Sequence, residues 1–461
     1  MFKASIYEKR RSQLTKKIDS GLLLFLGNEE SSMNYTDNVY PFRQDSNFLY
    51  FFGIDQPHLA AIIDVDEQKT ILFGDDFSIE MVVWMGPHPT IAELGKKVGV
   101  QHTAPYGELV DYLKKAGSAA RDIHFLPPYR PENKIKLHEW LDIPLAALND
   151  QASVPFIKGV VALAGIKSPE EIEEIEKAVD ISGLMHISAM KSTQSGIKES
   201  QLAGIVEGIA IAAGGRLAYP AIVTVNGQTL HNHYHGNTLK KGQLVLGDFG
   251  AETTMHYAGD ITRTFPVDAT FTQQQKEIYS IVLDAQMKAI EAIKPGVPYL
   301  DIHLLASTII AKGLIALGIM KGDADAAVAA GAHALFFPHG LGHMMGLDVH
   351  DMEDLGEQHV GYTESQSRSE QFGLNALRLA RPLEPGFVLT VEPGIYFIPE
   401  LIDSWEAEGR FTDYINYPKL KEYRTFGGVR IEDNILVTES GYRVLGQPIP
   451  KTIEEIEALR K

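Results

Sequence analysis

A helix-start signal about one third of the way along the chain divides the sequence into two parts. In the segment Ile166-Lys-Ser-Pro-Glu-Glu, Ser168 is the expected N-cap, Pro169 falls at the first helical position and Glu171 completes a capping box. Apolar residues then recur at helical spacing, at Ile172, Ile175, Ala178 and Ile181. We therefore predict a long helix that opens a second domain.

The two parts differ in the order of their predicted elements. At 461 residues the chain is too long for one hydrophobic core, so we expect two domains, over residues 1–160 and 167–461. Residues 1–160 alternate short apolar runs with helical and turn-rich stretches, which is typical of an α/β domain. The second part mixes predicted helices (201–213, 272–293 and 300–317) with predicted strands (244–249, 258–265, 387–396 and 427–438). This mixture predicts an α+β domain with a largely antiparallel sheet.

Composition argues against several classes of function. The sequence has no cysteine, which excludes disulfides, thiolate nucleophiles, iron–sulfur clusters and cysteine-based zinc sites. Its formal net charge of −18 opposes binding to nucleic acid or to an anionic membrane surface. The first residues lack the apolar stretch of a signal peptide. We expect a cytoplasmic protein that binds neither nucleic acid nor membrane.

Two aspartates flank a polar turn in the segment 247–265. If the strand-like runs on either side pair about a centre near Thr254, Asp248 and Asp260 face each other directly. Opposite residues have Cβ atoms about 4.5–5.5 Å apart, so two aspartates there repel each other unless a cation lies between them. The alternative is that both are ordinary turn-flanking aspartates, which are common in hairpins.

Three histidines, His339, His343 and His350, lie in a stretch punctuated by glycines, where the backbone can approach a site closely. A lone histidine is more often a core or surface residue than a ligand, but three within twelve positions favour a functional role. The motif His-Glu-x-x-His is absent, which argues against a zincin-type zinc site.

Two glutamates, Glu392 and Glu432, sit in strand-like apolar segments. A buried carboxylate is costly unless it is paired or bound to a metal, so each glutamate is either half of a buried ion pair or a metal ligand. Together with Asp248 and Asp260 they carry enough negative charge to neutralise two divalent cations, with one neutral histidine filling a remaining position. Oxygen-rich ligation favours Mn²⁺, although Co²⁺ or Zn²⁺ could substitute.

The segments around these residues resemble the pita-bread metallopeptidases, the family of prolidase, aminopeptidase P and methionine aminopeptidase. The resemblance rests on Tyr257-Ala-Gly-Asp-Ile-Thr-Arg-Thr-Phe-Pro, His339-Gly-Leu-Gly-His, Val391-Glu-Pro-Gly-Ile-Tyr and Gly428-Val-Arg-Ile-Glu-Asp. It implies a pita-bread fold and a binuclear site whose metal ligands are Asp248, Asp260, His343, Glu392 and Glu432. The first two aspartates are one residue further apart than in many members, which should lengthen the hairpin turn.

The resemblance also implies catalytic roles for four residues. Glu392 would shuttle a proton, and His350 with His233 would stabilise the oxyanion and orient substrate; His339 is the fourth catalytic candidate. His233 is preferred over His231 and His235, with which it alternates. Two alternatives remain. One is a non-catalytic module that binds peptides or proteins, and the other is a metal-free hydrolase of the creatinase type. The intact set of five metal ligands opposes both.

The implied substrate is a peptide with proline in second position. Tyr40-Pro-Phe-Arg-Gln-Asp-Ser resembles the N-terminal domain shared by prolidase and aminopeptidase P, and Arg430 resembles their substrate-side arginine. The position matching Arg378 grips the substrate carboxylate in prolidase, which favours a dipeptidase; the alternative is an aminopeptidase acting on longer peptides. Such enzymes oligomerise, so we expect a homodimer. Trp84 either reaches the partner's site or is a partly buried loop residue.

Overall fold

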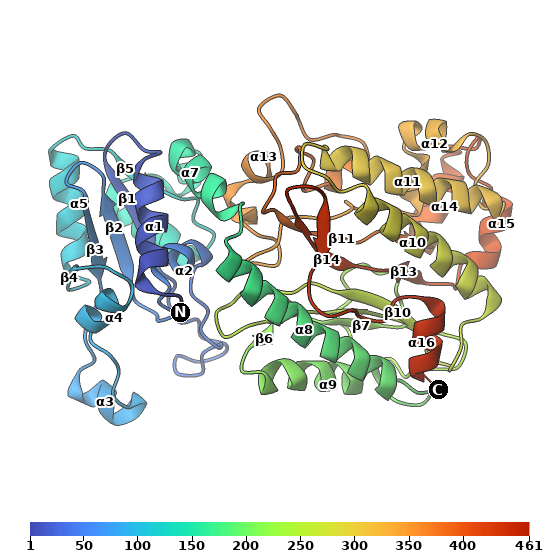
Figure 1. Ribbon diagram of the computed structural model, residues 1–461, viewed down its shortest axis with the longest axis horizontal. Helices are drawn as coiled ribbons and strands as arrows, with labels where there is room; N and C mark the ends of the chain where they lie inside the picture. The colour runs from blue at the N-terminus through green and yellow to red at the C-terminus, as the bar shows by residue number, and fades with distance from the viewer. Residues whose placement is uncertain (461) are drawn as a thin grey trace. The chain divides into compact units, whose positions relative to one another are not determined.

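The chain forms two compact units in the computed structural model, which describes residues 1–460 (Figure 1). The N-terminal unit comprises Met1–Ala164 together with Met352–His359, and the C-terminal unit comprises Gly165–Asp351 and the residues from Val360 onward. The N-terminal unit is therefore discontinuous in sequence, because a short segment from far along the chain completes it.

The N-terminal unit contains one mixed five-stranded sheet in the order β4-β3-β2-β1-β5. Strands β1, β2 and β3 pair antiparallel, whereas β4 and β5 join the two edges in parallel. The strands are β1 (Leu22–Leu26), β2 (Ala60–Asp64), β3 (Lys69–Phe73), β4 (His102–Ala104) and β5 (Ile123–Phe125). The helices are α1 (Ala4–Thr15), α2 (Ser46–Phe52), α3 (Ile79–Met85), α4 (Ile91–Lys97), α5 (Glu108–Ser118), α6 (Pro131–Leu141), η1 (Leu145–Ala147) and α7 (Val154–Ala164). This is the predicted α/β architecture.

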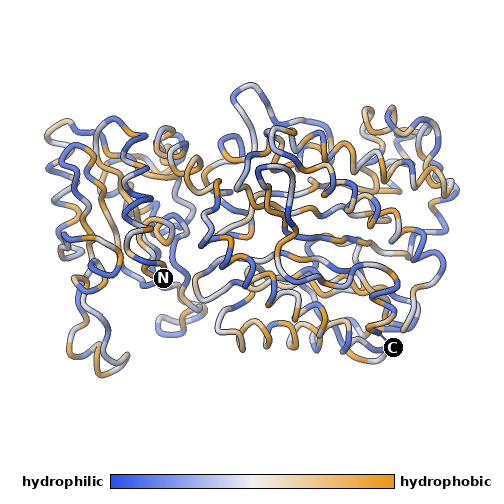
Figure 2. Tube along the Cα trace, in the orientation of Figure 1, coloured by the Kyte–Doolittle hydropathy of each residue, from blue (hydrophilic) through white to orange (hydrophobic). Residues whose placement is uncertain are grey.

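The core of this unit is aromatic. The ring centroid of Phe25 on β1 lies 5.1 Å from that of Phe51, 5.3 Å from that of Phe52 and 5.0 Å from that of Phe156. Helix α2 ends at Gly53, whose φ is +64° and where a Cβ atom would lie 2.2 Å from the ring of Tyr7. Figure 2 shows apolar residues concentrated along the strands that this core covers.

The strand pairs described for the C-terminal unit are all antiparallel, as predicted. They form the sheets β10-β8-β7, β11-β14-β15, β12-β13 and β6-β9. The strands are β6 (Arg216–Leu217), β7 (Ile222–Thr224), β8 (Leu244–Asp248), β9 (Ala251–Glu252), β10 (Thr262–Pro266), β11 (Val388–Val391), β12 (Gly394–Tyr396), β13 (Gly428–Arg430), β14 (Asp433–Val437) and β15 (Tyr442–Val444).

Helices cover these sheets in two groups (Figure 1). Helix α8 (Pro169–Ser192) begins as predicted, with Ser168 as N-cap and a capping box to Glu171. It packs beside α9 (Glu199–Ala212), while α10 (Gln273–Glu291) packs against α11 (Tyr299–Ala316) and against β11, β12 and β13. The remaining elements are α12 (Ala324–Ala330), η2 (Ala332–Leu335), η3 (Glu353–Leu355), α13 (Glu357–Val360), η4 (Leu374–Ala376), α14 (Pro399–Ala407), α15 (Tyr417–Leu420), η5 (Lys421–Tyr423) and α16 (Ile453–Arg460).

The hairpin that carries the two aspartates has a different register from the predicted one. Strands β8 and β10 pair Asp248 with Thr262, and the isolated bridge Glu252–Ala258 continues that register around the turn. The prediction that Asp248 and Asp260 face each other directly is therefore wrong, and Asp260 is a diagonal neighbour instead. The turn places His256 at φ 65°, in a region that glycine usually occupies, so no turn residue in the sequence marked its centre.

Each of the two long predicted strands that carry a glutamate is interrupted at that residue. Glu392 lies between β11 and β12, and Glu432 lies between β13 and β14. Strand β11 pairs with β14 in one sheet, and β12 pairs with β13 in another. The segments β11–β12 and β13–β14 therefore each pass from one sheet to the other at their glutamate. Pro393 has no N–H to donate to a ladder, which suits a strand break. The interruption frees both carboxylates from the regular sheet surface.

Candidate metal centre and active site

Three side chains that can bind a metal ion converge in the C-terminal unit. Asp260, His343 and Glu432 each offer one ligand atom, these atoms lie within 4.8 Å of one another, and all three residues are buried. They come from the segment before β10, from the loop after Pro338 and from the break between β13 and β14. Residues far apart in sequence thus form one cluster.

The other two predicted ligands lie at the edge of this cluster. The hydroxyl of Tyr219 is 2.7 Å from Asp248 Oδ1 and also contacts Asp260 Oδ1, so it links the two aspartates. His343 Nε2 lies 3.4 Å from Asp260 Oδ2 and 3.5 Å from Glu392 Oε1. The five residues predicted as metal ligands are therefore brought together.

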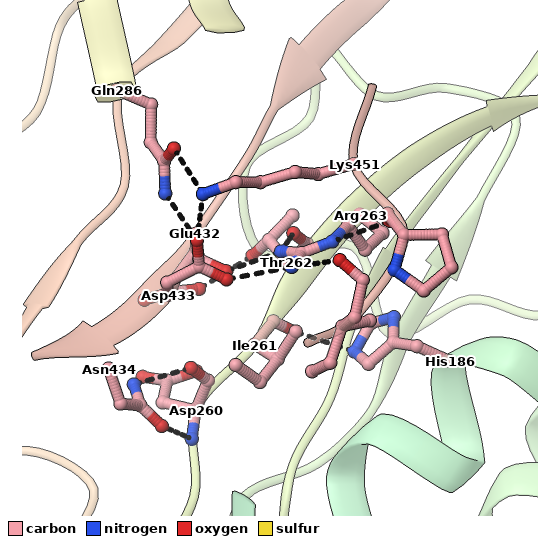
Figure 3. A network of polar contacts seen from close by, with 12 residues as sticks. His186, Asp260, Ile261, Thr262, Arg263, Gln286, Glu432, Asp433, Asn434 and Lys451 are labelled. Carbon is pink, nitrogen blue, oxygen red and sulfur yellow. Dashed lines mark hydrogen bonds and ion pairs between the residues drawn. The ribbon is translucent and has the colours of Figure 1, made fainter. Parts of the chain in front are cut away.

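Neighbouring polar groups fix the ligand side chains in place. Thr262 donates its hydroxyl to Glu432 Oε2 at 2.7 Å, and Thr390 donates to Glu392 Oε1 at 3.3 Å. The side-chain amide of Asn434 pairs with both the N–H and the carbonyl oxygen of Asp260, at 2.9 and 2.6 Å (Figure 3). The backbone that presents Asp260 is thus held by two hydrogen bonds.

The carboxylates of the cluster carry more negative charge than their protein neighbours balance. Burial, together with the charge of Asp260, raises the pKa of Glu392 to about 7. Burial and the charges of Asp260, Glu392 and Asp248 raise the pKa of Glu432 well above its usual value. Of the polar atoms described, Glu432 Oε1 is buried and has no hydrogen-bond partner. These groups fit bound divalent cations, which would satisfy the orphaned oxygen and offset the repulsion.

His343 partly offsets the negative charge of Asp260. Burial works to lower the pKa of His343, but its hydrogen bond with Asp260 and the charge of Glu392 outweigh burial, so the pKa is raised. Burial likewise works to raise the pKa of Asp260, and the contact with His343 reverses that effect. One imidazole cannot neutralise the remaining carboxylates.

A second polar network surrounds Asp433, the residue that follows Glu432 (Figure 3). Asp433 contacts Arg263 at 2.7 Å through Oδ1, while Oδ2 accepts from Gln286 at 2.7 Å and from Lys451 at 2.5 Å. Burial opposes ionisation of Asp433, but Arg263 and Lys451 outweigh it and lower the pKa to about 2. Here the protein itself balances the charge.

The predicted catalytic histidines border the cluster. The ring centroid of His350 lies 4.2 Å from that of His343. His339 Nε2 is 2.8 Å from the hydroxyl of Tyr396, and burial together with the charge of Arg430 lowers the pKa of His339 to about 3. Arg430 donates to the same tyrosine hydroxyl at 2.7 Å and to Asp248 at 2.5 Å. Arg430 is thus fixed beside the metal ligands.

The three alternating histidines differ in their surroundings. Partial burial, with the positive charges of Arg430 and Arg378, lowers the pKa of His231. His235 Nε2 is 3.0 Å from the carbonyl oxygen of Ala221. His233, the histidine selected from the sequence, is exposed. His231 is exposed as well, and His235 is partly buried.

Arg378 is carried by a segment that packs closely on the histidine loop. A Cβ atom at Gly340 would lie 2.9 Å from Leu377 Cα, and one at Gly361 would lie 1.7 Å from the carbonyl oxygen of Arg378. The hydroxyl of Tyr362 donates to the carbonyl oxygen of Leu377 at 2.7 Å. The backbone on which Arg378 stands is therefore fixed next to His339.

Comparison with protein families identifies this arrangement. Residues 173–439 match the model of metallopeptidase family M24, and residues 7–124 match that of the aminopeptidase P N-terminal domain. The chain belongs to metallopeptidase family M24. Divalent metal ions are the cofactors of such an enzyme, and the cluster of Asp260, His343 and Glu432 suits them. The fold is accordingly the predicted pita-bread domain with an N-terminal α/β domain.

Similar proteins include both Xaa-Pro dipeptidases and probable Xaa-Pro aminopeptidases. The Xaa-Pro dipeptidase of Homo sapiens is 34% identical over 467 residues, covering 96% of this chain and 89% of the relative. A probable Xaa-Pro aminopeptidase of Aspergillus niger is 32% identical, covering 98% of this chain and 91% of the relative. Among solved structures, Escherichia coli aminopeptidase P in complex with substrate is 31% identical with a TM-score of 0.83, covering 100% of this chain and 98% of that chain.

Several residues around the M24 site were not found by sequence reasoning. Thr262 and Thr390 each lie two residues from a ligand, at the spacing that shares one face of a strand, and this period could have revealed them. Tyr396 follows Glu392 within a quoted motif and could also have been noticed. Tyr219 lies far from the ligands in sequence, and no local signal marks it.

Proposed function

We propose that this M24 peptidase is an Xaa-Pro dipeptidase that hydrolyses the bond between a first residue and a following, carboxyl-terminal proline. The chain is an Xaa-Pro metallopeptidase, as its relatives across nearly the whole length indicate. The dipeptidase assignment goes further, because it requires a group that recognises the free carboxylate of the substrate.

The proposed mechanism assigns roles to residues of the cluster. Divalent cations held by Asp248, Asp260, His343, Glu392 and Glu432 would supply Lewis-acid polarisation of the scissile carbonyl and activation of water. The carboxylate of Glu392 accepts the proton of the attacking water and delivers it to the prolyl nitrogen as the bond breaks. His350, whose ring lies 4.2 Å from that of His343, donates to the oxyanion that develops on the carbonyl.

The position of Arg378 is the observation that carries the dipeptidase proposal. Close backbone packing at Gly340 and Gly361 fixes its segment beside His339. Its positive charge, with partial burial and the charge of Arg430, contributes to the lowered pKa of His231. A guanidinium forms a bidentate pair with a carboxylate, and such a pair at the end of the site would leave no room for a third substrate residue.

Kinetics on two substrate lengths test this proposal. We expect the wild-type enzyme to cleave Ala-Pro much faster than Ala-Pro-Ala, and Arg378→Ala to lower kcat/KM for Ala-Pro about ten- to a hundredfold, mainly through KM, since a charge-assisted hydrogen bond contributes about 1.5–3 kcal/mol. The loss for the tripeptide should be much smaller. Arg381→Ala is the matched control, because Arg381 lies on the same segment and pairs with Glu384 at 2.7 Å.

The other outcome of this experiment has a definite meaning. Aminopeptidase P of Escherichia coli is among the solved structures that resemble this chain. If the wild-type enzyme cleaves Ala-Pro-Ala as well as Ala-Pro, Arg378 does not limit substrate length and the enzyme is an Xaa-Pro aminopeptidase.

We propose Mn²⁺ as the metal in both positions, because four of the five ligands are carboxylates and oxygen-rich sites favour this ion. A solved relative, Escherichia coli aminopeptidase P, also exists in a zinc-substituted form. Metal-depleted enzyme reconstituted with Mn²⁺, Co²⁺ or Zn²⁺ tests the choice. Two ions bound per chain and the highest kcat with Mn²⁺ are expected, and full activity with one ion would contradict a binuclear site.

We further propose a homodimer, in which helix α3 contacts the second copy. The exposed side chains of this helix are large and apolar: Ile79 is 82% exposed, Val83 74% and Trp84 80%. Apolar residues gathered in this way mark interaction surfaces. Light scattering should give the mass of a dimer for the wild type and of a monomer for Val83→Asp/Trp84→Asp. A monomeric wild type would exclude this assembly.

A further inference from the structure

A buried ion pair lies next to the proposed catalytic histidine and outside the ligand set. Lys167 Nζ donates to Asp351 Oδ2 at 2.7 Å, and the side chains are only 1% and 7% exposed. Asp351 directly follows His350, and its N–H donates to the carbonyl oxygen of Met344 at 2.9 Å. The pair therefore fixes the end of the loop that carries both His343 and His350.

Glycine at position 346 makes room for this ion pair. A Cβ atom on Gly346 would lie 2.6 Å from Asp351 Oδ2 and 2.8 Å from Lys167 Cε. Gly346 is outside the left-handed region, so space is the reason for glycine here. Its carbonyl oxygen accepts from Ala258 N at 2.9 Å, two residues before Asp260. The loop of His350 thus touches the hairpin that presents a metal ligand.

The same hairpin is also tied to the start of helix α8. Tyr257 donates its hydroxyl to Glu171 Oε1 at 3.2 Å, and the other oxygen of Glu171 accepts from Ser168 N at 3.0 Å. Glu171 and Tyr257 are 2% and 1% exposed. Lys167 and Glu171 therefore connect one helix end to both the His350 loop and the Asp260 hairpin.

We propose that Lys167, Glu171, Tyr257 and Asp351 form a clasp that positions His350 over the metal-binding cluster. Buried ion pairs add little net stability compared with apolar residues of similar size, but in some proteins they fix a unique arrangement. A donor at a reacting carbonyl needs such a fixed arrangement, since a displacement of about 1 Å can cost a hundredfold in rate. The four residues are positioning residues, and this inference rests on the proposed catalytic role of His350.

A double-mutant cycle on the full-length, Mn²⁺-loaded enzyme tests the clasp. With Ala-Pro as substrate, Lys167→Met should lower kcat about ten- to a hundredfold while KM and the bound metal stay close to wild type. In a His350→Ala background, Lys167→Met should have almost no further effect, because the group it positions is gone. Tyr257→Phe should show the same pattern with a smaller loss, and it serves alone if Lys167→Met does not fold.

Each other result overturns the clasp or the assignment on which it rests. If the losses from Lys167→Met and His350→Ala multiply, or if Lys167→Met loses metal, Lys167 does not act through His350. If His350→Ala retains full activity, the proposed role of His350 fails instead. Arg121→Met is the control for a broken ion pair elsewhere, because Arg121 pairs with Asp64 in the N-terminal unit and should leave kcat unchanged.

Discussion

Glu432 and Asp433 are adjacent acidic residues, both buried, with opposite electrostatic surroundings. Asp433 accepts a hydrogen bond from Gln286 and faces Arg263 and Lys451; burial opposes its ionisation, but these two cations outweigh burial and lower its pKa to about 2. Glu432 faces other carboxylates, which with burial raise its pKa, and its Oε1 has no partner among the described residues. Because side chains alternate along an extended chain, one step in sequence separates two different environments.

The difference separates a charge that supports the fold from a charge that supports function. The protein supplies its own counter-ions to Asp433, so that network is complete when the chain folds. It supplies too few to the cluster around Glu432, so folding there leaves a charge deficit that only added cations remove. A buried carboxylate with an incomplete set of partners is therefore an informative sign of a metal centre.

Removing a ligand from the metal-binding cluster should have the largest effect on activity. We expect Asp260→Ala to lose both bound metal and activity, because the remaining ligands no longer form a closed site. Mn²⁺ at a thousand times its dissociation constant should stabilise the wild type by about 4 kcal/mol and leave the variant unchanged. Metal analysis and thermal unfolding with and without Mn²⁺ measure this, and a fully active Asp260→Ala enzyme would contradict the ligand assignment.

Breaking the complete network should instead affect stability. We expect Asp433→Ala to lose about 3–5 kcal/mol in free energy of unfolding, because it leaves the buried Arg263 and the partly buried Lys451 without their carboxylate. Asp284→Asn is the control, since the exposed pair of Asp284 with Lys288 should contribute no more than about 1 kcal/mol. Denaturation by urea of the metal-free proteins measures both, and equal losses would mean that the network of Asp433 contributes no more to stability than an exposed ion pair.

The two neighbouring histidines sharpen the distinction within the site. We expect His350→Ala to retain metal and to lose about 10²–10³ in kcat, the usual effect of removing a preorganised donor. His343→Ala should lose metal as well, because His343 Nε2 contacts both Asp260 and Glu392. Metal content and kcat are measured on the same preparations. Equal loss of metal in the two variants would mean that ligand and catalyst have been confused.

The smallest expected effect concerns the stability contributed by Asp64, a carboxylate of the N-terminal unit that Arg121 neutralises. Burial opposes ionisation of Asp64, but its hydrogen bonds with Arg121 and Tyr112 prevail and lower its pKa. A lowered pKa stabilises the fold above the unfolded value of about 3.9, and this contribution is lost as the pH falls further. The stability difference between wild type and Asp64→Asn should therefore shrink from pH 6 to pH 3; a constant difference would show that ionisation of Asp64 does not contribute.

The sequence predicted the site better than it predicted the local geometry around it. Acidic residues in apolar segments are unusual enough to mark Glu392 and Glu432 without any structure. The strand breaks at both glutamates could not be predicted, because the apolar runs 387–396 and 427–438 continue past these residues. Each run is divided only because its two halves pair with different strands. The turn at His256 was missed because a residue other than glycine takes the positive φ there, so no glycine marks the turn in the sequence.

Long-range partners were also beyond sequence reasoning. Nothing near Asp433 in sequence indicates Arg263 or Lys451, so Asp433 and Glu432 look alike until the chain is folded. The choice among His231, His233 and His235 has the same difficulty, because alternation puts all three on one face of an extended segment. Their surroundings differ only in the folded chain, where His235 Nε2 lies 3.0 Å from the carbonyl oxygen of Ala221 and partial burial, with the charges of Arg430 and Arg378, lowers the pKa of His231.

The discontinuity of the N-terminal unit has a consequence for synthesis on the ribosome. Residues 1–164 emerge first, but the segment Met352–His359 that completes their unit emerges only about 190 residues later. At about 5–20 residues per second this delay is roughly 10–40 s, far longer than a small domain needs to fold. The nascent unit must therefore persist without its last segment while the whole first part of the peptidase domain is translated, and that segment docks onto it after the His350 loop has left the ribosome.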